Sequence, residues 1–283
     1  MPSLPPSIGS LGYKPTRVLS NGLFGARWAV EQDDSPKSAT ADIVTADTEY
    51  KRQLWENAAK TKDWVTTSNV ATVIECGLLE DGDLFQIADL SPDALPLADA
   101  LPPSTASEAT IIKVFLDILS GLSVMHKSEL AHGMICPRCI YMEGDRYKLA
   151  ELWWAHNADG KPLASNLSYF FPANPPPFAL SYIAPEVLLG ETPRRSSDVY
   201  SFGAVLYLMA SGRAPREIDA RGQRPDRKTL EKEVPKLAEL RPDLSPMLTG
   251  TIDQMLHIVE YKRPATPALE AFEMTYSGRA VPD

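Results

Sequence analysis

The stretch Leu180–Gly203 reads LSYIAPEVLLGETPRRSSDVYSFG, and the rest of the chain can be placed relative to it. It holds a Ser-Tyr-Ile-Ala-Pro-Glu sequence that ends at Glu186, and Asp198 follows twelve residues later. The run Ala204–Ser211 is apolar on most faces, which predicts a buried helix. Near the start of such a helix, the Asp198 carboxylate can accept hydrogen bonds from backbone N–H groups.

This two-part spacing resembles the end of the activation segment and the start of the central helix in the eukaryotic-like (Hanks-type) Ser/Thr protein kinase family. The resemblance implies an α+β, bilobal, kinase-like fold in which Glu186, Asp198 and His132 are structural. In the family this Glu pairs with an Arg near the end of the large lobe, and Arg263 in Lys262–Ala265 matches it. We therefore expect a Glu186–Arg263 ion pair, with about 3–5 kcal/mol lost when either partner is removed. Asp198 is expected to bond the catalytic loop from behind.

Hydrophobic periodicity divides the chain into a small lobe and a large lobe. Alternating apolar residues predict five strands and one helix in the small lobe, and an apolar stripe over 108–127 predicts a long helix in the large lobe. The expected organisation is a disordered leader at 1–11, an N-lobe at 12–90, a mainly helical C-lobe at 91–276 and a tail at 277–283. The resemblance covers residues 12–276, so we predict one kinase-like domain.

The acidic composition argues against several classes of function. Lys and Arg number 28 against 37 Asp and Glu, for a net charge of −9. Nonspecific nucleic-acid binding needs a basic face that neutralises phosphates, so it is not expected. No apolar run approaches the roughly 18 residues of a membrane span, and the N-terminus does not resemble a signal peptide. A cytoplasmic location without membrane insertion is therefore expected. The three cysteines make no disulfide framework.

A glycine-containing turn near the N-terminus resembles the phosphate-cradling loop of the family. Glycine lacks a Cβ, so such a turn lets backbone N–H groups approach phosphates. Two of the three family glycines remain, Gly22 and Gly25, and Arg27 stands where the family has a small aliphatic residue. The family's third strand carries a Lys that pairs with ATP phosphates, but no Lys lies between Lys37 and Lys51. Gly22 and Gly25 are therefore residual candidates for nucleotide binding.

The expected catalytic loop lacks the groups that the family uses for phosphoryl transfer. Active members carry His-Arg-Asp and a later Asn, in which the Asp accepts the proton of the substrate hydroxyl and the Asn holds a metal ion. Here Met134 replaces the base, Cys136 replaces the Lys that steadies the phosphoryl group, and Cys139 replaces the Asn. A thioether takes no proton at neutral pH, so the resemblance gives no catalytic residue. His132 is kept.

The metal-binding Asp-Phe-Gly of the family is changed to Glu151-Leu152-Trp153. A Glu can bind Mg²⁺, but its side chain is one methylene longer, and Trp153 replaces a Gly whose backbone freedom lets the segment turn. We therefore expect no metal and no cofactor. The alternative is an atypical nucleotide-dependent transferase or nucleotide-binding sensor. It would use Glu151 for Mg or Mn, with Gly22 and Gly25 around the phosphates of ATP.

Residues 153–179 form a segment rich in aromatic residues and proline. A proline run favours extended, stiff backbone. One interpretation is that the segment folds onto its own large lobe and its aromatic residues fill the cleft. The other is a docking surface for a protein partner, because rigid aromatic side chains suit interfaces. The interaction candidates are Trp153, Trp154, Tyr169, Phe170, Phe171 and Phe178.

The sequence Cys136-Pro137-Arg138-Cys139, with His132 upstream, allows two further interpretations, a soft metal site or a redox pair. No second Cys-x-x-Cys exists, and Cys76 belongs to the other lobe. We therefore favour the interpretation that these cysteines are replacement residues in a site without activity.

Loss of the base, the phosphate Lys and the second metal ligand predicts a catalytically inactive family member, a pseudokinase, and hence no enzyme. We expect a protein-interaction scaffold or allosteric regulator in a signalling assembly. Its expected partner is a protein, such as an active kinase, and not a nucleic acid. The short loops point to a bacterial source. The alternative remains the atypical transferase that uses Glu151 for metal.

Overall fold

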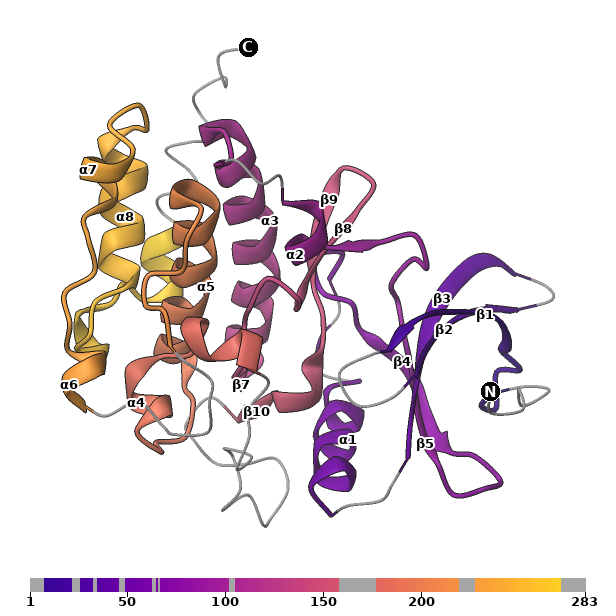
Figure 1. The fold of residues 1–283 in the computed structure, drawn as a ribbon. Coiled ribbons are helices and arrows are strands. Elements are labelled where there is room, and N and C mark those ends of the chain that lie inside the picture. Colours follow the sequence, from indigo (N-terminus) through magenta and orange to yellow (C-terminus); the bar gives the residue numbers. More distant parts are fainter. Residues whose placement is uncertain are drawn as a thin grey trace.

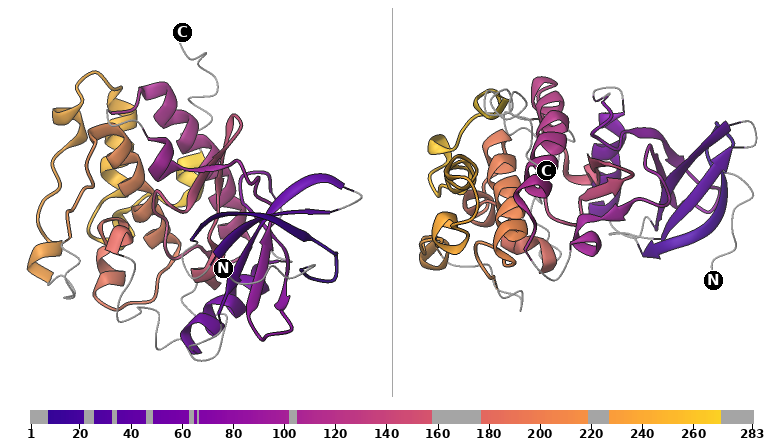
Figure 2. Two further views of the ribbon diagram at one scale, coloured as in Figure 1. Left: turned by 45° about the vertical axis from the view of Figure 1, so that its right-hand side comes forward. Right: turned by 90° about the horizontal axis from the view of Figure 1, so that it is seen from above.

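The computed structural model describes residues 8–21, 26–32, 35–45, 49–62, 65, 67–101, 105–157, 177–218 and 227–270, which form two lobes (Figure 1). The smaller N-lobe is built on a β-sheet, and the larger C-lobe is mainly helical. Figure 2 shows the two lobes side by side from two further directions. The α+β, bilobal fold that the sequence predicts is confirmed.

The N-lobe is a five-stranded antiparallel sheet in the order β1-β2-β3-β5-β4. Its strands are β1 (Lys14–Asn21), β2 (Ala26–Gln32), β3 (Ser35–Val44), β4 (Val73–Leu78) and β5 (Leu84–Ala88). Helix α1 (Glu49–Thr61) packs against β4 and β5 and also contacts the C-lobe. The register of the β2–β3 pair places Arg27 opposite Asp42, and both side chains are buried. The sheet therefore directs a cation and an anion toward the space between the lobes.

Residues 8–11, which fall within the disordered leader expected at 1–11, are described and packed, so the expectation is corrected for these four residues. Ile8 is fully buried and forms a β-bridge with Tyr13. The Glu75 carboxylate, on β4, accepts hydrogen bonds from the backbone N–H groups of Ser10 and Leu11. Residues 1–7 lie outside the described residues. Residues 8–11 are thus part of the N-lobe.

The C-lobe contains helices and short strands. The helices are α2 (Leu97–Ala100), α3 (Glu108–Lys127), α4 (Pro185–Leu188), α5 (Arg195–Ser211), α6 (Arg227–Leu230), α7 (Leu237–Leu240) and α8 (Pro246–Met255). The strands are β6 (Leu95–Pro96), β7 (Leu130–Ala131), β8 (Ile140–Glu143), β9 (Arg146–Leu149) and β10 (His156–Asn157). The described residues also include the 3-10 helices η1 (Leu152–Trp154), η2 (Pro177–Tyr182) and η3 (Glu260–Lys262).

Helices α3 and α5 form the centre of the C-lobe. Phe115 on α3 stacks on Phe202 on α5, with ring centroids 5.8 Å apart. The expectation that no apolar run approaches a membrane span is corrected by α3, which is long and apolar enough by length and composition. However, 61% of that stretch is buried inside the protein. The apolar character of α3 therefore serves the core of the lobe.

Candidate functional site

Asp198, in the first turn of α5, organises the loop that follows β7. Its carboxylate accepts hydrogen bonds from the backbone N–H groups of His132 and Gly133, both at 2.8 Å, and lies 3.0 Å from Nε2 of His126. Burial alone raises the pKa of Asp198, but the bonds and charges of its neighbours outweigh burial and lower it. The loop is thus held from behind by a charged, fully bonded carboxylate.

Glu186 and Arg263 form a bidentate ion pair beside this loop. Arg263 Nη1 and Nη2 donate to the two Glu186 carboxylate oxygens at 2.7 and 2.8 Å, and Ser197 Oγ donates at 2.8 Å. The Arg263 side chain is fully buried. The pair expected from the resemblance is present, and it ties the end of the 177–188 segment to the C-lobe.

The loop after β7 presents buried, uncharged groups at the positions where the resemblance places the base and the second metal ligand. Met134 is 3% exposed and Cys139 is 1% exposed. The ring of His132 is fixed by its neighbours. Its Nδ1 accepts from the N–H of Met134 at 3.3 Å, so its Nε2 donates to the carbonyl of Ala150 at 2.8 Å. His132 therefore acts as a structural link from this loop to the strand β9 region.

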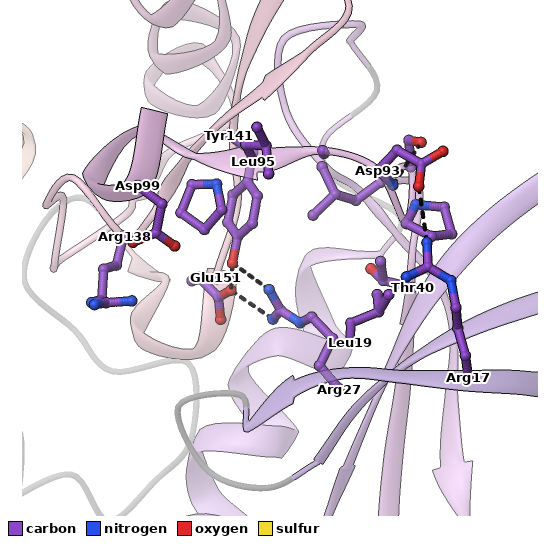
Figure 3. A pocket seen from close by; sticks show the side chains of 15 residues that line it. Arg17, Leu19, Arg27, Thr40, Asp93, Leu95, Asp99, Arg138, Tyr141 and Glu151 are labelled. Carbon is purple, nitrogen blue, oxygen red and sulfur yellow. Dashed lines mark hydrogen bonds and ion pairs between the residues drawn. The ribbon is translucent and has the colours of Figure 1, made fainter. Parts of the chain in front are cut away.

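The cleft between the lobes holds a buried ion cluster centred on Arg27 (Figure 3). The Arg27 guanidinium donates to both oxygens of Asp42, through Nε at 2.7 Å and Nη2 at 2.6 Å. Nη2 also donates to Oε1 of Glu151 at 2.6 Å, and Nη1 donates to the hydroxyl of Tyr141. Tyr141 donates in turn to Glu151 at 3.0 Å, and Nε1 of Trp153 donates to the other Glu151 oxygen at 3.1 Å. The lobes are thus joined by a cation with two carboxylates.

Burial and charge shift the pKa values of Arg27, Glu151 and Tyr141. Burial lowers the pKa of Arg27, but the charges of Asp42 and Glu151 outweigh it and raise that pKa well above its usual value. Burial, with the Asp42 charge, raises the pKa of Glu151. Burial and the Glu151 charge also raise the pKa of Tyr141. The cluster therefore keeps a permanent cation between two carboxylates.

A cavity of about 440 Å³ adjoins the cluster, between the N-lobe sheet and the segment that links the lobes. Arg27, Tyr141 and Glu151 form one of its walls, and Thr40 on β3 lines it as well (Figure 3). Leu95 lies in the linking segment that lines it. The volume lies within the range of small-molecule pockets, about 300–1,000 Å³. The cleft can therefore admit a small ligand beside the two carboxylates.

The other predicted site residues are placed as follows. Gly22 and Gly25 lie outside the described residues, as do Tyr169, Phe170 and Phe171. The backbone of Phe178 lies in η2, and its side chain is outside the described part of the structure. The interaction candidates Trp153 and Trp154 are each only 2% exposed, so they belong to the core and not to a docking surface. The expectation for those two residues is corrected accordingly.

Sequence reasoning missed the contacts that Arg27 makes with Asp42 and Tyr141. An Arg and an Asp in adjacent strands were a usable signal, because a hairpin register places them opposite each other. Tyr141 carried no such signal, since it lies far along the chain from both.

Comparison with curated proteins finds relatives that are named serine/threonine-protein kinases. The chain is 28% identical over 221 residues to the serine/threonine-protein kinase PknJ of Mycobacterium tuberculosis, a match that covers 74% of this chain and 36% of the relative. It is 24% identical over 204 residues to the probable serine/threonine-protein kinase zyg-1 of Caenorhabditis elegans, covering 72% and 28%. The chain thus spans about a third of the length of these curated relatives.

Solved structures show the same fold. The kinase domain of Mycobacterium tuberculosis PknI superposes with a TM-score of 0.69 at 19% identity, covering 97% of this chain and 100% of that one. A second crystal structure of that domain gives a TM-score of 0.68 at 19% identity, covering 96% and 99%. At this identity the likeness concerns the fold alone.

The expectation that this chain is not an enzyme is contradicted by these comparisons. The relatives are named serine/threonine-protein kinases, and the family model described as "Protein kinase domain" matches residues 43–277. Counting replaced residues was therefore an insufficient basis for excluding enzymatic activity. Because the family model matches more than half of the sequence, the chain belongs to the protein kinase domain family.

Proposed function

We propose that this domain is an atypical nucleotide-dependent phosphotransferase of a signalling pathway, with ATP and a divalent metal ion bound between its lobes. The observation that carries this proposal is the convergence of Asp42 and Glu151, from opposite lobes, on one cation beside a cavity. The names of the relatives support protein Ser or Thr side chains as the acceptor. A need for ATP supports a cytoplasmic location.

The chemistry of the site fits a divalent metal ion. Carboxylate oxygens suit Mg²⁺, which is commonly bound through one or two carboxylates together with phosphates and water. The Arg27 guanidinium already occupies the position of a cation between Asp42 and Glu151. A bound metal ion would supply charge neutralisation for the transferring phosphoryl group. Its binding requires Arg27 to release these carboxylates, and the freed guanidinium can then bind phosphate oxygens in a bidentate manner.

From the residues of the loop after β7, we expect phosphoryl transfer to be slow. Met134 accepts no proton, so the acceptor hydroxyl must lose its proton to another group. Phosphoryl transfer depends mostly on positioning and electrostatic stabilisation, so this loss slows the reaction without abolishing it. Losing one stabilising donor commonly costs about 10²–10³ in rate. The activity is therefore expected to be well below that of a kinase with a complete set of groups.

A second role, through contact with a protein partner, is favoured by the bridge between the lobes. Arg27 and Glu151 are joined in a buried position, which holds the N-lobe and the C-lobe in one relative orientation. A fixed orientation suits a domain that regulates a signalling assembly as a scaffold or allosteric partner. This role would be supported if cross-linking to a protein partner were lost when Arg27 is replaced and were unaffected by ATP.

The test of the first proposal is a calorimetric titration of the domain with ATP, with and without Mg²⁺ or Mn²⁺, followed by transfer assays with labelled ATP. A ligand at 100 times its Kd adds about 2.7 kcal/mol of stability, so thermal unfolding gives an independent readout. Glu151→Gln is expected to remove metal-dependent binding. Glu186→Gln is the matched control, since it changes a buried, paired Glu outside the cleft and should leave binding intact. No heat, no thermal shift and no transfer by the parent protein would contradict the proposal.

A further inference from the structure

Two buried thiols, Cys136 and Cys139, face each other in the loop after β7. Their sulfur atoms lie 3.3 Å apart. The residues between them form a turn in which the N–H of Cys139 donates to the carbonyl of Cys136 at 2.9 Å. The two thiols are 0% and 1% exposed. The pair is thus preorganised by the backbone of the turn.

This geometry meets the requirements of a disulfide. A turn of four residues brings the first and last Cα atoms within about 7 Å, and disulfides span Cα separations of about 4.4–6.8 Å. An S–S bond is about 2.05 Å long, so the two sulfur atoms must approach by only about 1.2 Å. The change can be absorbed by side-chain rotation, with no rearrangement of the loop.

A metal site is a weaker use of the same residues. His132, the expected third ligand, has Nε2 bonded to the carbonyl of Ala150 and Nδ1 bonded to the N–H of Met134. Across the described part of the chain, no group of three or more His, Cys, Asp or Glu side chains is placed to hold a metal ion. The chemistry open to this pair is therefore the chemistry of two thiols.

We propose that Cys136 and Cys139 form an internal disulfide when the folded protein meets a peroxide. One thiolate attacks an oxygen of hydrogen peroxide, the O–O bond breaks, and a sulfenic acid and one water form after proton transfer. The second thiol attacks that sulfur, the S–S bond forms, and the hydroxyl leaves as a second water. The two thiols lose two electrons and two protons in total, and one peroxide is reduced to two waters. This proposal does not depend on the proposed phosphotransfer.

The position of the pair gives the disulfide a structural consequence. Cys139 Sγ donates a hydrogen bond to the carbonyl of Met134 at 3.2 Å, and oxidation removes that donor. The backbone carbonyl of Cys139 also accepts a hydrogen bond from the N–H of Ala150, the residue before Glu151, at 2.8 Å. A disulfide at Cys139 therefore forms beside the contacts that hold the loop after β7 next to the Glu151 region.

Both thiols are buried, so only a small oxidant that enters through local opening of the loop can reach them. We expect oxidation to be slower than at an exposed cysteine and to end in the disulfide, because the second thiol is already in contact. Cys76 is partly exposed and lies on β4, away from the pair, so it reports the behaviour of a cysteine without a neighbouring thiol.

Arg138, between the two cysteines, allows a direct test by mass spectrometry. The folded protein is treated with hydrogen peroxide, quenched, alkylated in denaturant and digested with trypsin at mildly acidic pH. Cleavage after Arg138 separates Cys136 and Cys139 into the peptides 128–138 and 139–146, which stay together only if a disulfide joins them. We expect the joined peptides, lighter by two hydrogen atoms than their sum, with loss of two of the three alkylatable thiols.

Variants separate the internal disulfide from other oxidation products. Cys76→Ser should give the joined peptides in the same yield, whereas Cys136→Ser should give none and leave Cys139 alkylatable or oxidised alone. Native-state circular dichroism before quenching shows that the oxidised protein is folded. The proposal is overturned by oxygen adducts on a single cysteine without joined peptides, by linkage through Cys76, or by joined peptides that form only in denaturant.

Discussion

Arg27 Nη2 lies 2.6 Å from Oε1 of Glu151, so a guanidinium of the N-lobe sheet is held by a carboxylate of the C-lobe. Asp42, on the neighbouring strand, binds the same nitrogen at 2.6 Å. When both carboxylates are ionised, the three side chains carry one excess negative charge. In a buried position, desolvation offsets much of the attraction, so the cluster as a whole adds little stability, whereas losing one member is costly.

Replacing Arg27 by Met is expected to lower the free energy of unfolding by about 3–5 kcal/mol. Asp42 and Glu151 would stay buried without their countercharge, while Met retains part of the packing of the long side chain. Urea unfolding at neutral pH measures the change. Adding Asp42→Asn to this variant should restore part of the loss, because one of the two unpaired charges is then removed.

Arg17→Met is the control for this measurement. Arg17 pairs with Asp93 on the surface, with side chains 58% and 87% exposed, so its replacement should change stability by at most about 1 kcal/mol. Equal losses of unfolding free energy in the Arg27 and Arg17 variants would show that burial of the ion cluster adds nothing to the cost of losing Arg27.

The contacts that hold the C-lobe could be predicted from motif spacing. Glu186 and Arg263 are 77 positions apart, yet each belongs to a short motif whose place in the fold is known once the family resemblance is seen. The same holds for Asp198 and the N–H groups behind the loop after β7. In these cases the family motif specifies the partner together with the residue, so naming the residue also names the contact.

The cluster in the cleft could not be predicted in this way. In the sequence alone, Arg27 is a replacement for the small aliphatic residue of the family. Glu151 is a replacement for its metal-binding Asp. Only the β2–β3 register and the packing of the two lobes bring them to Asp42 and Tyr141. The prediction that the chain is not an enzyme was overturned by its relatives and its family. That prediction had counted absent groups without knowing which charges share the cleft.

Stability in acid should depend on Glu186. Burial alone raises its pKa, but the hydrogen bonds and charge of Arg263 outweigh burial and lower the pKa below the usual 4.5. As the pH falls from about 5 to about 3, the unfolded chain takes up a proton at this position before the folded protein does, so stability is lost. Glu186→Gln takes up no proton there, so its unfolding free energy, measured by urea titration at each pH, should decline less steeply. An unchanged slope would contradict the lowered pKa.

Glu75 is expected to stabilise the start of the chain. Glu75→Ala would leave the N–H groups of Ser10 and Leu11 without their acceptor and should cost about 1–3 kcal/mol. Hydrogen exchange of these two amides should speed up more than exchange in the C-lobe helices. Glu31→Ala, at an exposed position on β2, is the control and should leave both amides protected. Similar exchange in the two variants would show that residues 8–11 are held by other contacts.

Two helical glycines should respond to alanine in opposite directions. A Cβ on Gly203, in α5, would lie 2.7 Å from Cβ of Met255, so α5 and α8 must move apart. Gly203→Ala is therefore expected to cost about 1–3 kcal/mol in unfolding free energy. Gly250 on α8 is exposed and has no atom within 4 Å of an added Cβ, so Gly250→Ala should stabilise the protein by about 0.5–1 kcal/mol through helix propensity. Thermal unfolding of both variants measures the contrast. If Gly203→Ala were also stabilising, the α5–α8 contact would have to tolerate an extra methyl group, and the close approach of these helices would not explain glycine at this position.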